Sequence, residues 1–311
     1  MIKGFKIILS LLAMTLLASG CFKPRDYDYS RWYEDPDGSA GGRTVKVMSF
    51  NLRSASSNDP GERSWASRRP AVKAMLQEQN PLVMGTQECN IIQRKHIIED
   101  DPRYAAIGIN LNGPDEECEE CAVFYLKDSV EVLSHATFYL TSTPDTPSRY
   151  PNTNHYRVCT WGKMKLKNGG QEFYFFNTHL EYSAAHARQP EMDVILEKLG
   201  EIVTEELPVV LLGDFNCDET DGIFTGIKRW GMESCRQKAA IGDSHKTHNA
   251  FGGYAQTLDH AWSRGFASVN NFTTVRDKYA GITAHLQSSV FKLYKDLIDS
   301  IHEEGIVAYT S

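Results

Sequence analysis

The sequence predicts an α/β domain in which two β-sheets pack together and helices lie on the outside. From Val45 onward, strand-like apolar runs alternate with a few helical stripes and are joined mostly by loops. No internal repeat or interior linker divides this region, so one domain is expected over residues 45–311. The 311 residues are 41% hydrophobic and 23% charged, as in an ordinary globular protein with a full core. This composition excludes a disordered chain, a collagen-like repeat and a polytopic membrane protein.

The individual elements follow from apolar periodicity in chain order. Runs of β-forming or continuously apolar residues predict strands at residues 45–51, 82–87, 122–126, 130–133, 158–166, 172–178, 208–212 and 258–262. Helical spacing predicts one helix over residues 71–79, which stops before Pro81, and a second over residues 192–203. Residues 167–170 predict a hairpin turn, and residues 290–301 fit either a helix or a strand that passes into a helix.

The charge balance argues against one class of partner. The chain has 33 Lys and Arg residues against 40 Asp and Glu residues, for a net charge of −7. A broad basic surface that grips nucleic acid through its phosphates is therefore not expected, whereas a local basic groove is still compatible with these numbers.

The N-terminus predicts an export signal. Residues 1–20 combine two lysines, a short apolar run and small residues before Cys21, which is the pattern of a secretory signal peptide. The run L-A-S-G-C resembles a bacterial lipobox, and this resemblance implies cleavage before Cys21 and lipid attachment to its sulfur. A plain signal peptide with a coincidental cysteine is the alternative. Residues 21–44, rich in Pro, Gly and charge, then predict a lipid-anchored tether.

The other cysteines point to no metal or redox site. Cys118 and Cys121 lie in the acidic run E-C-E-E-C, where a surface-loop disulfide or two free thiols are expected. A lone C-x-x-C without a second ligand pair is weak evidence for zinc, and its acidic flanks disfavour a low-pKa thiol. Cys159 lies in an apolar run and is expected in the core.

Polar side chains gather where the predicted strands end, and such ends are where active sites are assembled in layered folds. Asn51, Glu88, Asp214 and Asn216 offer the hard oxygen ligands that Mg²⁺ or Mn²⁺ prefers. A metal of this kind neutralises a phosphate and lowers the pKa of bound water, and His179 can transfer a proton near neutral pH. Singly, each residue is more often a turn, a cap or an ordinary core histidine. Several such ends in one chain are harder to explain as accidents.

Six short motifs make the chain resemble the endonuclease/exonuclease/phosphatase superfamily, which has the deoxyribonuclease-like fold. They are M-S-F-N-L-R (48–53), G-T-Q-E (85–88), R-V-C-T-W (157–161), N-T-H-L (177–180), G-D-F-N (213–216) and T-L-D-H-A-W (257–262). The resemblance covers about Val45 to His285. It implies a four-layered α/β sandwich with two mixed β-sheets, and metal-dependent hydrolysis of a phosphoester.

The resemblance also implies a role for each matching residue. Glu88 would be the principal metal ligand with Asn51 beside it, and Asp214 would orient or activate the attacking water. Asn216 would hold the phosphate or that water. His179 would bond to the phosphate and assist the leaving group.

Two further matching residues complete the implied site. Asp259 would orient a catalytic histidine near the C-terminus, and Arg157 would brace the site.

The C-terminal end departs from the family pattern. Where the family has S-D-H followed by a residue and a proline, this chain reads T-A-H-L-Q over residues 283–287. His285 is therefore the candidate partner of Asp259, while Ala284 stands in place of a metal-binding aspartate and its methyl group cannot ligate. His248 is a second loop histidine that could face the site or simply lie on the surface.

The sequence thus predicts a membrane-tethered, extracytoplasmic phosphodiesterase that uses Mg²⁺ or Mn²⁺. The phosphoester substrate would be nucleic acid, a phospholipid head group or a small molecule, and lipid anchoring modestly favours the last two. No protein partner is implied, and a monomer is expected. The alternative from another class is a weakened or inactive member that binds a phosphorylated ligand, as Ala284 would favour. A purely structural envelope lipoprotein would leave the polar strand ends unexplained.

Overall fold

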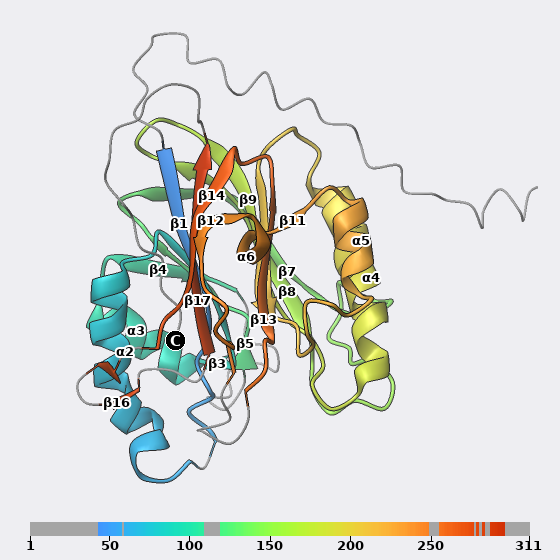
Figure 1. Ribbon diagram of the computed structural model, residues 1–311. Coiled ribbons are helices and arrows are strands. Elements are labelled where there is room, and N and C mark those ends of the chain that lie inside the picture. Colours follow the sequence, from blue (N-terminus) through green and yellow to red (C-terminus); the bar gives the residue numbers. More distant parts are fainter. Residues whose placement is uncertain are drawn as a thin grey trace, which may run out of the picture.

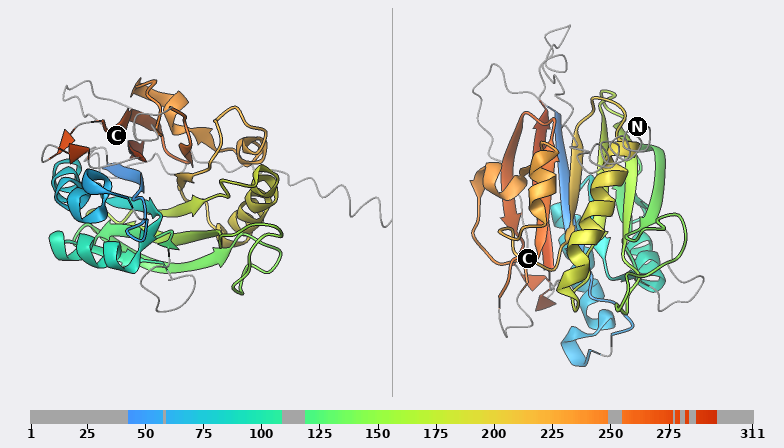
Figure 2. Two further views of the ribbon diagram at one scale, coloured as in Figure 1. Left: turned by 90° about the horizontal axis from the view of Figure 1, so that it is seen from below. Right: turned by 90° about the vertical axis from the view of Figure 1, so that its right-hand side faces the viewer.

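The protein is described by a computed structural model that covers residues 43–57, 59–108, 119–248, 255–276, 278–279, 282–283 and 287–295. Within these ranges two mixed β-sheets pack face to face, and helices cover their two outer faces (Figure 1). The predicted α/β sandwich with two sheets is therefore confirmed. The helices that cover one sheet come from the first half of the described chain, and those that cover the other come from the second half (Figure 2).

The first sheet has seven strands, in the order β12-β14-β17-β1-β2-β6-β4. Their bounds are β1 Arg43–Asn51, β2 Val83–Gln87, β4 Tyr104–Ile107, β6 Val123–Leu126, β12 Ala239–Gly242, β14 Ser268–Thr274 and β17 Gln287–Lys295. At its centre, β1 runs parallel to β2 and antiparallel to β17. The parallel pair brings the carboxyl ends of β1 and β2 to the same edge of the sheet.

The second sheet has six strands, in the order β11-β13-β10-β9-β8-β7. Their bounds are β7 Val130–Tyr139, β8 Val158–Leu166, β9 Glu172–His179, β10 Val209–Asp214, β11 Glu233–Ser234 and β13 Asp259–Arg264. β9 and β10 are the parallel neighbours here, while β13 runs antiparallel to β10. Two small pairs lie outside both sheets: β3 (Cys89–Asn90) with β5 (Glu119–Glu120), and β15 (Lys278–Tyr279) with β16 (Ile282–Thr283).

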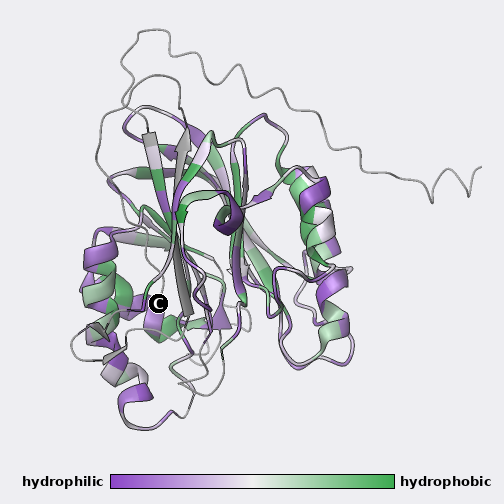
Figure 3. Ribbon diagram, viewed as in Figure 1, coloured by the Kyte–Doolittle hydropathy of each residue, from purple (hydrophilic) through white to green (hydrophobic). Residues whose placement is uncertain are grey.

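The longer helices lie outside the sheets, and hydrophilic and hydrophobic residues alternate along them (Figure 3). The short helix at Cys235–Lys238 instead contacts strands of both sheets. The helix bounds are η2 Gly61–Arg63, α2 Trp65–Gln79, α3 Ile91–Asp100, α4 Ala185–Ile202, α5 Phe224–Arg229 and α6 Cys235–Lys238. α2 and α3 cover the seven-stranded sheet, whereas α4 and α5 cover the six-stranded sheet (Figure 1). No helix in the described ranges is both long enough and apolar enough to cross a membrane.

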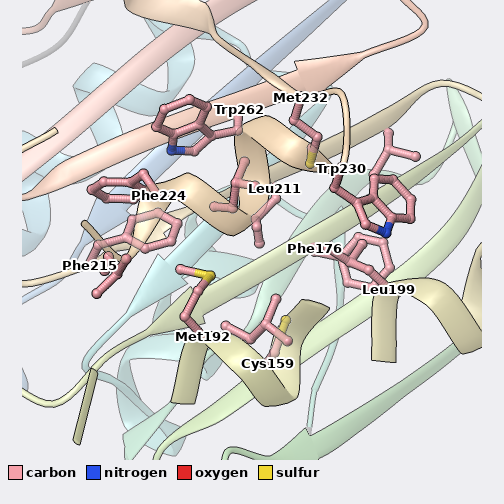
Figure 4. Packing of buried hydrophobic residues seen from close by; sticks show 14 of the residues in the cluster. Cys159, Phe176, Met192, Leu199, Leu211, Phe215, Phe224, Trp230, Met232 and Trp262 are labelled. Atoms are coloured by element: carbon pink, nitrogen blue, oxygen red, sulfur yellow. The ribbon is translucent and has the colours of Figure 1, made fainter. Parts of the chain in front are cut away.

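Apolar burial holds these layers together in three clusters. Residues of both sheets form the central cluster, which includes Val47, Phe175 and Leu212. A second cluster lies beneath α2 and α3, and a third beneath α4 and α5. In the third, Met192 and Leu199 of α4 point toward the sheet, whose residues interlock with them (Figure 4). Removing such buried apolar area from water is the main stabilising term of the fold.

Most expected elements are present, and local hydrogen bonds and backbone conformations account for where they begin and end. The helix that was expected to stop before Pro81 is α2, which ends at Asn80 in the left-handed conformation, with φ of 43°. Its start at Trp65 is six residues earlier than expected, because Ser64 caps it by accepting a hydrogen bond from the backbone N–H of Ser67. Residues 167–170 form the expected turn, closed by the Gly170 N–H donating to the carbonyl of Leu166.

The C-terminal region differs from the helical interpretation. Residues 290–295 belong to β17, a strand that pairs with the whole of β1, so the strand alternative is correct there and residues 296–311 lie outside the described chain. The spacing of apolar residues in a short run does not distinguish a strand that is buried at every position from a helix. Cys121 is buried with a free thiol rather than exposed in a surface loop, and Cys118 lies outside the described residues. Cys159 is in the core, as expected.

Gly213 is required by the close approach of β9 and β10. Its φ is 151°, and a Cβ atom there would lie 2.0 Å from the Thr178 carbonyl oxygen. We expect Gly213→Ala to lower the free energy of unfolding by about 3 kcal/mol or more, because the two strands must separate. Urea unfolding measures this loss. Gly222→Ala, where a Cβ meets nothing within 4 Å, is the matched control and should change stability by less than about 0.5 kcal/mol. Equal stability of the two variants would contradict the argument.

Candidate active site

The two parallel strand pairs bring the predicted site residues to one edge of the sandwich. Asn51 ends β1, and Glu88 directly follows β2, its parallel neighbour. His179 ends β9 and is in register with Asp214 at the end of β10, which is in turn in register with Asp259 at the start of β13. Five residues separated by up to 208 positions in the sequence thus converge because of strand order alone.

Asn51 joins the two halves of the site. Its Nδ2 donates to Glu88 Oε1 at 2.8 Å and to Asp214 Oδ2 at 3.1 Å, so one amide links a carboxylate from each sheet. The Asn51 Oδ1 accepts a hydrogen bond from the backbone N–H of Arg53 at 2.9 Å, which fixes the orientation of the amide. The two carboxylates are held close together, an arrangement that like-charge repulsion opposes.

The backbone at two of these residues is strained. Glu88 has φ of 53° and Asn216 has φ of 52°, values in the left-handed region that non-glycine residues avoid. The Glu88 Oε2 accepts a hydrogen bond from Ser54 N at 3.4 Å, and Asn216 Nδ2 donates to the Leu180 carbonyl at 2.9 Å. Strained residues that the surrounding structure holds in place are concentrated at functional sites.

Asp214 lies at the centre of the site and is buried. Its Oδ1 accepts a hydrogen bond from Asn216 N at 3.0 Å, and its Oδ2 lies 3.8 Å from Nε2 of His179. Burial raises the pKa of Asp214 to about 6, against the opposing effect of the Asn51 hydrogen bond. Burial also holds the pKa of His179 well below its usual value, with the nearby Arg157 acting in the same direction. His179 is therefore a neutral imidazole at pH 7, able to donate a hydrogen bond from one ring nitrogen.

Asp259 is a buried carboxylate at the start of β13. The Thr247 hydroxyl accepts hydrogen bonds from the backbone N–H groups of Leu258 and Asp259, and its interaction with the Asp259 carboxylate partly offsets the effect of burial on the pKa of that group. Burial, with Asp214 nearby, raises the pKa of Asp259 well above its usual value. A buried carboxylate normally has a donor or a cation as partner. His285, the expected partner, and Ala284 lie outside the described residues.

Five of the predicted site residues line a cleft of about 780 Å³. Asn51, Glu88, His179, Asp214 and Asn216 all contribute to its wall. His248 lines it too, so the alternative in which this histidine faces the site agrees with the structure. The volume is in the range of cavities that take small-molecule ligands.

Other lining residues were not singled out from the sequence as site residues. Glu119 follows the cysteine of the E-C-E-E-C run, Arg53 ends the first motif, and Tyr182 lies just beyond N-T-H-L. His155 lies two residues before Arg157. Position next to a motif was the available signal, but loop residues follow no periodicity that would show which of them turn inward. Burial raises the pKa of Glu119 to about 7, and the charge of Glu88 contributes to this shift.

The family comparison agrees with the fold and the site. The model of the endonuclease/exonuclease/phosphatase family matches residues 48–278. The chain belongs to this family. The resemblance drawn from the six motifs is therefore confirmed, and the family match supports a phosphoester hydrolase.

Three relatives illustrate the range of the family. A solved family protein from Bacteroides thetaiotaomicron is 27% identical, with a TM-score of 0.74 over 82% of this chain and 99% of that one. The mannosyl-6-phosphatase of Bacteroides thetaiotaomicron VPI-5482 is also 27% identical, with a TM-score of 0.73 over 80% of this chain and 98% of that one. An uncharacterized protein of Acanthamoeba polyphaga mimivirus is 23% identical over 73% of this chain and 90% of its own length.

The donor set at the centre of the family site fits a hard divalent cation. Glu88 and Asp214 supply carboxylate oxygens, whereas Asn51 turns its NH₂ group toward them and would ligate an ion through Oδ1, the atom that here accepts from Arg53 N. No group of three His, Cys, Asp or Glu side chains converges as a closed cage within the described residues. A site with few protein ligands suits Mg²⁺ or Mn²⁺, because these ions keep several water ligands. The thiol of Cys217, which lines the cleft, is a poor thiolate ligand, because burial raises its pKa to about 12.

Arg157 forms a hydrogen bond with the buried Glu181, and the buried Glu191 in turn supports Glu181. The Arg157 Nε donates to Glu181 Oε2 at 3.3 Å, which agrees with the bracing role expected for this arginine. The backbone N–H of Glu181 donates to Glu191 Oε2 at 2.9 Å, so α4 is tied to the loop that follows His179. Burial raises the pKa of Glu191 to about 7.

This shift predicts a pH-dependent cost at Glu191. Because its pKa is higher in the folded than in the unfolded state, ionisation favours unfolding, and stability is lost as pH rises from about 4.5 to about 7. Glu191→Gln has no ionisable group but keeps an acceptor for Glu181. Its stability advantage over the wild type should therefore grow by about 2 kcal/mol between pH 5 and pH 8. Thermal unfolding at both pH values measures this difference. An advantage that is the same at both would show that Glu191 ionises normally.

Proposed function

We propose that the protein is a divalent-metal-dependent phosphoester hydrolase that acts outside the cytoplasm on a small phosphoester. One observation carries the proposal: Asn51 hydrogen-bonds carboxylates from both sheets, with His179 beside them, inside a polar cleft. The similarity to a mannosyl-6-phosphatase extends the candidate substrates from phosphodiesters to phosphomonoesters of small alcohols. The acidic chain further favours a small substrate over nucleic acid.

Each residue has a role that follows from its position. Glu88 and Asn51 would hold Mg²⁺ or Mn²⁺, and this ion supplies neutralisation of phosphate charge and a lowered pKa of water. Asp214 accepts a proton from the attacking water or orients it, since its carboxylate is buried and already fixed by Asn51 and Asn216. The neutral His179 donates a hydrogen bond to a phosphate oxygen as charge develops there.

The remaining charged groups complete the site. Arg157 faces the cleft with its guanidinium and meets the phosphate charge, while Glu181 holds it in place. Asp259 is proposed to orient His285, because it is a buried carboxylate in register with Asp214 at the edge where the site residues converge. A variant with Asp259→Asn should then lose turnover in the same proportion as His285→Ala, and the double variant should lose little more.

The lipidated N-terminus is part of the proposal. Processing before Cys21 and acylation of its thiol would hold the cleft near a membrane surface, with residues 22–44 as the tether. Expression of the full chain in a bacterial host with a radiolabelled fatty acid should label the wild type and not Cys21→Ser. Label on both proteins, or on neither, would overturn the anchor while leaving the hydrolase proposal intact.

Metal-dependent turnover is the direct test of the proposed reaction. The purified full-length protein would be assayed with bis(p-nitrophenyl) phosphate, p-nitrophenyl phosphate and mannose 6-phosphate, in Mg²⁺, in Mn²⁺ and in excess EDTA. We expect hydrolysis of at least one substrate with either ion and loss of at least about 95% of it in EDTA. Full activity in EDTA would contradict metal dependence.

Ala284 makes a second function worth testing in the same assay. If the wild type binds phosphorylated ligands without turnover and Ala284→Asp restores hydrolysis, the protein is a binding member of the family. Turnover by the wild type excludes that alternative.

A further inference from the structure

We propose that the cleft selects a phosphoester whose leaving group is a hydroxylated ring, and that Tyr182 is the platform on which this ring stacks. The inference rests on the proposed function and adds its substrate class and a specificity-determining residue. It begins with an aromatic side chain that is exposed and yet fixed in place.

Tyr182 is 57% exposed, one of three large apolar side chains exposed within the described chain. The other two, Leu133 and Ile241, do not line the cleft, whereas Tyr182 does. A single exposed tyrosine on an ordinary surface needs no explanation. Tyr182 differs because it lies at the wall of the cleft, two residues beyond Leu180 and the end of β9.

The tyrosine ring and its backbone are held from several sides. The His155 ring lies 5.5 Å from the Tyr182 ring, centroid to centroid, and the Arg157 guanidinium carbon lies 6.0 Å from it. Arg188 Nη2 donates to the Tyr182 carbonyl at 2.8 Å, and its Nε donates to the Glu181 carbonyl at 2.7 Å. A ring that is fixed before a ligand arrives loses little conformational entropy on binding, which is what a stacking platform requires.

The neighbouring loop supplies acceptors for hydroxyl groups. β9 and β10 are parallel neighbours, so the loop after Asp214 runs beside the loop that carries Tyr182. In it, Asp218 Oδ1 accepts hydrogen bonds from Thr220, and Asp221 Oδ1 accepts one from Ile223 N at 3.1 Å. These bonds use one oxygen of each carboxylate, and both residues line the cleft. A carboxylate has a second oxygen that can accept, so both residues offer acceptors for substrate hydroxyls.

The lining combines charges of both signs with little apolar surface. The cations of Arg53, Arg157, Arg188 and Lys246 attract an anionic phosphate, and the carboxylates of Glu119, Asp218 and Asp221 offer acceptors to hydroxyl groups. Apart from Tyr182, the apolar lining side chains are Cys217, Ala255 and Leu258, too few to bury an acyl chain. A phosphorylated monosaccharide has one anionic group, a ring face and several hydroxyls, and it matches every part of this wall.

A cyclic and an acyclic hydroxylated phosphomonoester test the inference. Turnover of glucose 6-phosphate and of acyclic glycerol 3-phosphate would be measured for the wild type, Tyr182→Ala and Tyr182→Phe. We expect Tyr182→Ala to lower kcat/KM about tenfold for glucose 6-phosphate, mainly through KM, and less than about twofold for glycerol 3-phosphate. Tyr182→Phe keeps the ring and should retain wild-type discrimination.

Ile241→Ala, which removes an equally exposed apolar side chain remote from the cleft, is the matched control and should leave both substrates unchanged. Asp221→Asn should lower kcat/KM for the hexose phosphate more than for glycerol 3-phosphate, a second readout independent of Tyr182. If Tyr182→Ala affects both substrates equally, or if the wild type prefers glycerol 3-phosphate, the platform is wrong and the hydrolase proposal stands. If the wild type hydrolyses no phosphoester at all, the proposed function itself fails.

Discussion

Glu88→Gln is expected to reduce kcat/KM by about 10³-fold or more, while the protein stays folded. Glutamine has the shape of glutamate and keeps an oxygen that can accept from Asn51 Nδ2, as Glu88 Oε1 does at 2.8 Å. What is lost is the negative charge, on which binding of a divalent cation at this position depends. Steady-state turnover in Mg²⁺ and in Mn²⁺, together with calorimetric titration of each ion, measures the two consequences.

The control for this variant is Glu131→Gln, which makes the same chemical change at an exposed position on β7. It should leave turnover within about twofold of the wild type, as expected for a surface substitution away from the site. A Glu88→Gln protein that binds the ion and hydrolyses substrate as the wild type does would remove Glu88 from the metal site. The ion would then have to be bound by Asp214 together with residues other than Glu88.

The strands that carry the site could be predicted from the sequence because their apolar patterns are unambiguous. Residues 158–166 form β8 with the expected bounds, and the unbroken apolar run before Asp214 forms β10, buried at every position. The polar residue that ends such a run is visible because it interrupts the pattern. Asn51, His179 and Asp214 were found in this way, and the structure places all three in one cleft.

Other parts of the fold gave no comparable signal. Helix α3 was missed, since its start depends on a side-chain capping box between Asn90 and Gln93 and only two of its residues are buried. The strands β14 and β17 follow the predicted strand at residues 258–262. They are held by long-range pairing, in which β17 pairs with both β14 and β1. Local propensity is a weak guide where tertiary pairing decides the conformation.

The loop residues that line the cleft could not be predicted for a different reason. Tyr182, His155 and Asp221 lie in loops, where no apolar period tells which side chains face inward. The convergence of Tyr182 and Asp221 depends on β9 and β10 being adjacent and parallel, a fact of strand order that the sequence did not reveal. The residues that carry chemistry were therefore easier to find than the residues that select the substrate.

The buried charge of Asp214 serves catalysis but lowers the stability of the fold. Its carboxylate is desolvated and close to Glu88, and burial raises its pKa to about 6. The sign follows from linkage: because the folded state disfavours the ionised form, stability falls as pH rises from about 4 through 6. Above that range the protein carries the full cost of a buried charge that catalysis needs.

Asp214→Asn should separate the two effects. Turnover should fall by about 10²- to 10⁴-fold, since an amide cannot accept the proton of the attacking water. In EDTA at pH 8 the variant should nevertheless be more stable than the wild type, by about 1 to 3 kcal/mol, because no charge is buried. At pH 4 the two proteins should have nearly equal stability. Urea unfolding at both pH values, alongside turnover in Mg²⁺, measures each part.

Asp128→Asn makes the same substitution at an exposed turn residue and should leave turnover unchanged. A less stable Asp214→Asn protein at pH 8 would mean that the hydrogen bonds from Asn51 and Asn216 outweigh desolvation of the carboxylate. Asp214 would then be a structural anchor of the site rather than a group held ready for proton transfer. Lost turnover with gained stability is the combination that only a buried catalytic carboxylate produces, and neither measurement alone distinguishes it from ordinary damage to the fold.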